Sequence, residues 1–146
     1  MAKISDNLKK LFIATDHAAV DLKANLIADL DTLPWEDLGP ATSESVDYPD
    51  YAHKLCDLVD ESKGYYGILI CGSGQGMALA ANKHKNIRAA LCWNDEITKL
   101  SRQHNDANVL CLGARFIDEP QAISLIKLFL ETEFEGGRHK NRVSKI

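Results

Sequence analysis

The sequence predicts an α/β fold in which helices cover both faces of a parallel sheet. Two observations support this class. Strand-like and helix-like stretches alternate along the whole chain, and residues 66–71 (YGILIC) form an apolar run without alternation. A continuous apolar run is typical of a central parallel strand covered on both faces. Five successive strand–helix units in 146 residues therefore indicate a three-layer α/β/α sandwich.

The first half of the chain begins with two predicted strands. Residues 10–15 (KLFIAT) form a buried strand, and residues 18–30 then place apolar side chains at helical spacing. Residues 33–38 form a weaker strand, since Pro34 confines it to a sheet edge or a strand start. Asp47 is expected to cap the helix that follows.

The second half repeats the alternation from the central strand at 66–71 onward. The predicted elements are a helix at 77–83, a strand at 87–93, a helix at 95–104, a strand at 108–113 and a helix at 120–134. Pro120 stands in the first turn of the last helix, where proline is tolerated. The glycines at 136 and 137 then break the chain before a basic tail, residues 136–146.

Right-handed crossovers favour a doubly wound, Rossmann-like sheet with the strand order 2-1-3-4-5. We expect one domain over residues 1–146, because no linker or repeat interrupts the pattern. Ligands of such sheets bind beyond the carboxyl ends of the strands. This rule selects three loops, which begin at Asp16-His17, at Cys71 and at Trp93-Asn94.

The composition excludes several partners. A net charge of −4 argues against nucleic acid or an anionic membrane, and no apolar run is long enough to span a bilayer. The polar N-terminus lacks a secretory signal, so we expect a cytoplasmic protein. The tail holds Arg138 and Arg142 four residues apart, which is either a solvated basic segment or one helical face that grips phosphate.

The four cysteines divide into two kinds. Cys56, Cys92 and Cys111 stand in apolar surroundings and are expected to be small core residues. Cys71 instead ends the central strand, immediately before the glycine-rich loop 72–76 (GSGQG). None belongs to a C-x-x-C pair, and we expect no disulfide framework.

The loop 72–76 is either a tight connection or a cradle of backbone N–H groups for an anion or oxyanion. Met77 occupies the position where a dinucleotide fingerprint needs its third glycine and where a cysteine-phosphatase loop needs arginine. No Walker sequence is present. A helix that starts after the loop would favour the thiolate of Cys71, so this cysteine is either a base or nucleophile, or an inert strand-end residue.

Other polar groups are individually ambiguous. Asp16 and His17 could be a helix cap and its neighbour, and His104 could simply complement a helix C-terminus. Together, a thiol, two histidines, a carboxylate, an anion cradle and paired arginines suit proton transfer beside the carbonyl of a sugar phosphate. The cysteines and histidines offer no zinc-like spacing, so we expect no metal.

With these residues in place, the sequence resembles the RpiB/LacAB family of sugar-phosphate isomerases. The matching segments are IATDHAAVDLK, DYPDYA, GILICGSGQGMALAANK, IRAALC, LSRQHNDANVLCLGAR and FEGGRHKNRV. The resemblance implies interconversion of ribose 5-phosphate and ribulose 5-phosphate through an enediolate, without metal or other cofactor.

The resemblance also implies roles for individual residues. Cys71 would move the proton between C1 and C2, and His104 would act as the acid that opens the furanose ring. The enediolate oxygen would be stabilised by the loop of Gly72, Ser73, Gly74, Gln75 and Gly76. Further substrate and phosphate contacts would come from Asp16, His17, Tyr48, Asn105, Arg115, Arg138 and Arg142.

Sites of the family lie between subunits, so the resemblance implies a homodimer, with a tetramer as the larger possibility. The chain departs from many relatives at Ala19, where they have glycine, and at Ser73, where threonine is common. Some relatives use a glutamate of the loop helix in place of the cysteine; here Gln75 cannot act as a carboxylate base, which favours a mechanism based on Cys71.

Two alternatives remain open at this stage. The substrate could be another aldose phosphate, such as allose 6-phosphate or galactose 6-phosphate, because sequence does not determine pocket depth. The protein could also be non-catalytic, binding phosphorylated sugars or sensing oxidants through Cys71.

Overall fold

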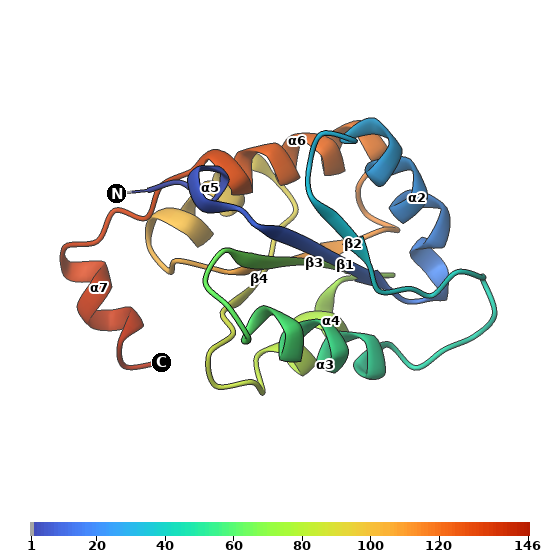
Figure 1. Cartoon of the computed structure of the whole chain (residues 1–146), viewed down its shortest axis with the longest axis horizontal. Coiled ribbons are helices and arrows are strands. Elements are labelled where there is room, and N and C mark those ends of the chain that lie inside the picture. Colours follow the sequence, from blue (N-terminus) through green and yellow to red (C-terminus); the bar gives the residue numbers. More distant parts are fainter. Residues whose placement is uncertain (1) are drawn as a thin grey trace.

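The computed structural model describes residues 2–146 and contains a five-stranded parallel sheet between two layers of helices (Figure 1). Met1, the first residue of the expected domain span, lies outside the described residues. The strands are β1 (Lys10–Thr15), β2 (Trp35–Asp37), β3 (Tyr65–Cys71), β4 (Ala89–Leu91) and β5 (Val109–Gly113). The helices are α1 (Ile4–Asn7), α2 (Val20–Asp29), α3 (Tyr48–Val59), α4 (Gln75–Ala81), α5 (Asp95–Gln103), α6 (Glu119–Glu131) and α7 (Arg138–Val143), and a 3-10 helix spans His17–Ala19.

The strand order is β2-β1-β3-β5-β4, so the predicted order 2-1-3-4-5 is wrong at its last two strands. The physical reason lies in how completely each strand is covered. All five residues of β5 are buried, whereas the three residues of β4 are only partly buried. The fully apolar strand therefore takes the inner position beside β3, and the short β4 becomes an edge.

The outer edge of β4 is covered by a side chain. The Asn82 amide nitrogen donates to the carbonyl oxygen of Ala89 (2.9 Å), and the N–H of Ala89 donates to the Asn82 side-chain oxygen (2.8 Å). This pair satisfies two backbone groups that face away from β5, where no further strand is present among residues 2–146.

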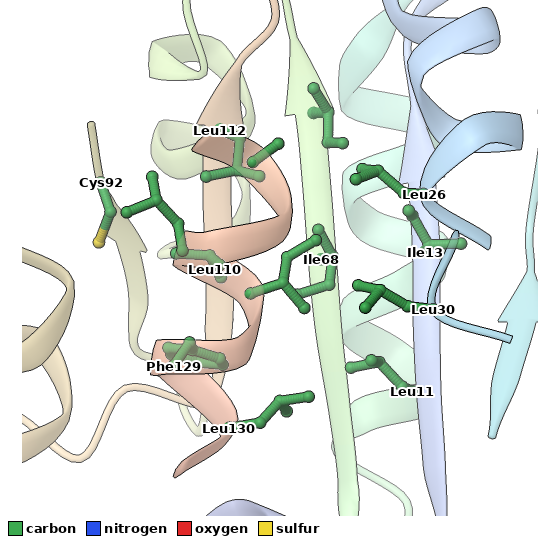
Figure 2. Close-up of a cluster of buried hydrophobic side chains, with 14 of the residues drawn as sticks. Leu11, Ile13, Leu26, Leu30, Ile68, Cys92, Leu110, Leu112, Phe129 and Leu130 are labelled. Carbon is green, nitrogen blue, oxygen red and sulfur yellow. The ribbon is translucent and has the colours of Figure 1, made fainter. Parts of the chain in front are cut away.

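The sheet separates two hydrophobic cores, because successive side chains of a strand point to opposite faces. Leu11 and Ile13 of β1 join the core under α2 and α6, while Phe12 and Ala14 join the core under α3 and α4. Figure 2 shows the first core, in which Leu26, Leu30, Phe129 and Leu130 meet side chains of β1, β3 and β5. Both faces are thus covered, as the continuous apolar run of β3 predicts.

Most predicted elements are confirmed, with shifts at their ends. The first strand matches its predicted bounds, and the strand predicted at 87–93 shortens to the three residues of β4. Asp47 occupies the N-cap position of α3, but its side chain makes no capping hydrogen bond, so that part of the prediction is wrong. The basic tail contains a helix, α7, which places Arg138 and Arg142 one turn apart.

The parallel strands define two ends of the sheet. At the carboxyl end, the strands lead into the loops that follow them. α7 lies beyond the other end, where the parallel strands begin (Figure 1). Among residues 2–146, no helix is long and apolar enough to cross a membrane.

Candidate functional site

Cys71 lies at the carboxyl end of β3, with only 5% of its surface exposed. The N–H of Gly74 donates a hydrogen bond to its sulfur at 3.2 Å. A hydrogen bond of this kind stabilises a negative charge on the acceptor. Cys71 is therefore packed in the core under α3 and α4 and is also hydrogen-bonded to the loop that follows it.

The loop can adopt this shape because Gly74 has a positive φ of 77°. A Cβ at this position would also lie 2.5 Å from Cδ1 of Leu91 and 2.9 Å from the carbonyl carbon of Leu112. Only glycine fits both the backbone conformation and the space. The predicted glycine-rich turn thus has a structural requirement at its centre.

The end of β5 supports the same loop. The N–H of Ala114 donates to the Cys71 carbonyl (2.9 Å), and the N–H of Arg115 donates to the Gly72 carbonyl (3.0 Å). A Cβ on Gly113 would lie 2.6 Å from the Ser73 carbonyl oxygen. Gly113 was not among the predicted site residues, and the only signal was a glycine closing the apolar run at 108–113.

Two exposed side chains contact glycines of this loop. The Arg115 guanidinium lies over Gly72, where a Cβ would be 3.2 Å from the guanidinium carbon. The Tyr48 ring packs on Gly76, where a Cβ would be 2.5 Å from the ring. The structure therefore brings Tyr48 and Arg115 to the loop that carries Cys71.

Asp16 and His17 follow β1 at the same end of the sheet. The N–H of Asp16 donates to the carbonyl of Ile70, the residue before Cys71 (3.0 Å), and its carboxylate accepts from the N–H of Ala18 (2.9 Å). The Nδ1 atom of His17 accepts from the N–H of Val46 (3.3 Å). A neutral His17 then carries its proton on Nε2.

The backbone of the loop is partly committed already. Besides the Gly74 N–H on the Cys71 sulfur, the N–H of Gln75 donates to the Ser73 hydroxyl oxygen (3.3 Å). An incoming oxyanion must therefore use other donors, and N–H groups in the first turn of a helix have no partner within it. Those of Gly76 and Met77 at the start of α4 belong to this class.

A second group of predicted residues lies elsewhere in the chain. α5 returns from the carboxyl end of the sheet to the amino end, so His104 at its C-cap and Asn105 lie near the start of β5. Arg138 and Arg142 are exposed on α7, beyond the same amino end (Figure 1). Within one chain, these four residues do not join the Cys71 loop.

The turn that carries His104 and Asn105 is fixed by a buried arginine. Arg102 is 2% exposed and donates from Nη1 to the Asp106 carboxylate (2.8 Å) and to the Ala107 carbonyl. Asp106 has a positive φ of 47°, a conformation that costs free energy for a residue with a Cβ. The ion pair and the carbonyl contact hold the turn in this shape.

His104 belongs to a cluster that sequence reasoning missed. Its Nε2 atom lies 3.4 Å from Oε1 of Glu135, and the rings of His104 and His139 stack with centroids 4.2 Å apart. Burial, the nearby His104 and the positive charge of Arg138 lower the pKa of His139. Glu135 and His139 do stand in the segment FEGGRHKNRV, but no spacing rule in the sequence links them to His104.

The remaining cysteines are core residues, as predicted. Cys56, Cys92 and Cys111 are buried and free. Burial raises the pKa of Cys56 to about 12, and it raises the pKa of Cys92 and, most strongly, that of Cys111. A thiol with a raised pKa is a poor base or nucleophile at neutral pH, so these three are unsuited to catalysis.

Comparison with known proteins gives matches over nearly the whole chain. Residues 11–146 match the family model for Ribose/Galactose Isomerase. The chain is 40% identical to the ribose-5-phosphate isomerase B of Escherichia coli over 95% of each chain. It is 45% identical to a probable ribose-5-phosphate isomerase B of Mycoplasma pneumoniae over 93% of this chain and 91% of the relative.

Solved structures agree with these sequence matches. Ribose 5-phosphate isomerase B from Anaplasma phagocytophilum superposes with a TM-score of 0.90 at 48% identity, covering 99% of each chain. Ribose-5-phosphate isomerase B from Mycoplasma genitalium, with bound ribulose-5-phosphate, superposes with a TM-score of 0.90 at 42% identity, covering 94% of each chain.

Proposed function

We propose that this chain, which belongs to the ribose/galactose isomerase family of sugar-phosphate isomerases, interconverts D-ribose 5-phosphate and D-ribulose 5-phosphate. The observation that carries the proposal is the Cys71 sulfur, hydrogen-bonded by the Gly74 N–H at 3.2 Å in the loop that Arg115 and Tyr48 flank. The similarity to a structure with bound ribulose-5-phosphate supports the choice of the five-carbon substrate.

In the proposed reaction, the Cys71 thiolate removes the proton from C2 of the open-chain aldose. The electron pair of that C–H bond forms the C1=C2 double bond, and the C1 carbonyl oxygen becomes the enediolate oxygen. The C2 hydroxyl then loses its proton as the C2 carbonyl forms, the first oxygen is protonated, and Cys71 returns its proton to C1. Each step moves only protons, so this reaction needs neither a metal nor another cofactor.

The developing oxyanion needs donors aimed at it. The N–H groups of Gly76 and Met77, in the first turn of α4, and the Ser73 hydroxyl, in the loop before it, are suited to this role because they follow Cys71 closely in the chain. Gly74 and Gln75 contribute indirectly, since their N–H groups hold the sulfur and the Ser73 side chain in place. Asp16 and His17 would bind the sugar hydroxyls.

A second copy of the chain is needed to complete the site. His104, Asn105, Arg138 and Arg142 lie at the amino end of the sheet, away from the Cys71 loop at the carboxyl end (Figure 1). We therefore propose a homodimer in which the partner chain supplies His104 as the ring-opening acid. The two arginines, one turn apart on α7, would bind the phosphate of the substrate.

The test is an isomerase assay on the purified protein with ribose 5-phosphate, allose 6-phosphate and galactose 6-phosphate, with and without a chelator. We expect conversion of the pentose phosphate, unaffected by the chelator. Preferential conversion of a hexose phosphate would replace the proposed substrate while retaining the mechanism. If none of the three sugars is converted, the protein is a binding or redox protein and the proposal is wrong.

A further inference from the structure

Three side chains that can bind metal converge near the amino end of the sheet. His104 ends α5, Glu135 precedes α7, and His139 lies in the first turn of α7. His104 Nε2 is 3.4 Å and His139 Nε2 is 3.9 Å from the same carboxylate oxygen, Oε1 of Glu135. One ligand atom from each residue can be chosen so that all three lie within 4.8 Å of one another, a property no other such group has within residues 2–146.

We infer that His104, Glu135 and His139 bind a divalent transition-metal ion such as Zn²⁺, and that the bound ion inhibits the enzyme. Two histidines and a glutamate are the ligand set of several zinc sites that keep a fourth position open. A tetrahedral zinc ion with bonds of ~2.0–2.1 Å holds its ligand atoms roughly 3.4 Å apart. Nε2 of His104 already lies at this distance from Oε1 of Glu135. Nε2 of His139 lies about half an ångström farther than this from the same oxygen.

The backbone holds the three residues in place. The N–H of Glu135 donates to the carbonyl of Gln103, the residue before His104 (3.0 Å), and the N–H of His139 donates to the carbonyl of Gly136 (3.0 Å). The imidazole rings are stacked and nearly parallel, with an interplanar angle of 11°. The Nε2 lone pairs of parallel rings cannot converge on one ion, so metal binding requires the imidazoles to rotate out of this stacked arrangement. The partly exposed side chain of His104 has room to do so.

The ion can reach this position from solvent. The side chain of His104 is 39% exposed and that of Glu135 is 49% exposed, so the open coordination position faces water. Arg138 and Arg142 on α7 place positive charge nearby, which opposes a cation. With one carboxylate and no fourth protein ligand within the described cluster, we expect reversible binding, weaker than that of a structural zinc site.

The inhibitory effect rests on the proposed function, in which His104 is the acid that opens the sugar ring. A metal ion on Nε2 occupies the lone pair that would otherwise carry the proton. Zinc binding and ring opening are then mutually exclusive at His104. A chelator should restore activity fully, because the ion is not part of the active form.

Zinc binding is measured first, by calorimetric titration of chelator-treated, buffer-exchanged full-length protein with ZnCl₂. We expect one ion per chain, and at least about tenfold weaker affinity in His139→Gln and in Glu135→Gln. The matched control is His53→Gln, since His53 and His84 form a second imidazole pair (2.7 Å) outside the cluster. Its zinc affinity should equal that of the unmodified protein, and circular dichroism confirms that each variant is folded.

Inhibition is measured separately, as the isomerase rate against free Zn²⁺. Unchanged affinity in both cluster variants, or an equal loss in His53→Gln, would overturn the metal site. Binding without inhibition would retain the site and overturn its effect on His104. A protein that binds zinc but converts no sugar would refute the proposed function while leaving the metal site intact.

Discussion

Replacing Gly113 with alanine should reduce turnover, although Gly113 itself supplies no proposed catalytic group. Its Cβ would lie 2.6 Å from the Ser73 carbonyl oxygen and 2.8 Å from the Ser73 carbonyl carbon. Ordinary contacts of this kind begin at 3.4 Å, so the backbone of Ser73 must move by about 0.8 Å. The obstacle is backbone, which cannot rotate away as a flexible side chain can.

The displacement acts on the loop that holds Cys71. Because a shift of about 1 Å can cost roughly 100-fold in rate, we expect kcat to fall roughly 10- to 100-fold. Overpacking should also lower the free energy of unfolding by roughly 1–3 kcal/mol. Steady-state kinetics with ribose 5-phosphate and urea denaturation measure the two effects independently.

Gly67→Ala is the matched control. It makes the same substitution in β3, but the added methyl group meets the side chain of Leu55 in the core and not the loop. We expect a similar loss of stability with kcat close to that of the unmodified protein. Wild-type kcat in Gly113→Ala would refute the reasoning, and so would an equal loss of kcat in the control.

Three further predictions concern single side chains. Cys71→Ala should reduce isomerase activity to background while circular dichroism shows an intact fold; near wild-type turnover would exclude Cys71 as the base. Arg142→Ala should raise KM for ribose 5-phosphate at least about tenfold, with a smaller change in kcat. The control Lys145→Ala, which removes a positive charge just after the end of α7, should leave KM unchanged. Because burial raises the pKa of Cys56 from 9.0 to about 12, the folded state resists its ionisation. The stability that the protonated Cys56 thiol contributes is therefore fully present below pH 9. It is lost as the pH rises from 9 to 12, which lowers the free energy of unfolding by at most about 4 kcal/mol. Because Cys92 and Cys111 are also buried thiols with raised pKa, Cys56→Ala should still lose stability over this range, but with a shallower slope than the unmodified protein in denaturation measurements. Parallel curves would contradict the role of Cys56.

The sequence was sufficient to predict the layers of the fold but not the order of its last two strands. The apolar run of β3 and the alternation of strands and helices determine the parallel sheet with covered faces. The choice between β4 and β5 as the inner strand depends on how completely each one is buried against neighbours far away in sequence. Short stretches such as Ala89–Leu91 do not show this locally.

The candidate site was predictable where residues follow a strand end. Asp16, Cys71 and the loop glycines lie at the carboxyl end of the sheet because parallel topology brings strand ends together. Gly113 and Glu135 were missed, since their contacts with Ser73 and His104 join segments about 30 to 40 residues apart, which leaves no periodic signal.

Asn82 has a consequence for how separate copies of the chain behave when they meet. An open strand edge is a template on which other chains can add strands, and this is a common route to aggregation. By engaging both backbone groups of Ala89, the Asn82 amide blocks the first position of such a template, and β4 offers only two residues beyond it. At this edge of the sheet, a newly made chain therefore offers little backbone to which a strand of another chain could add.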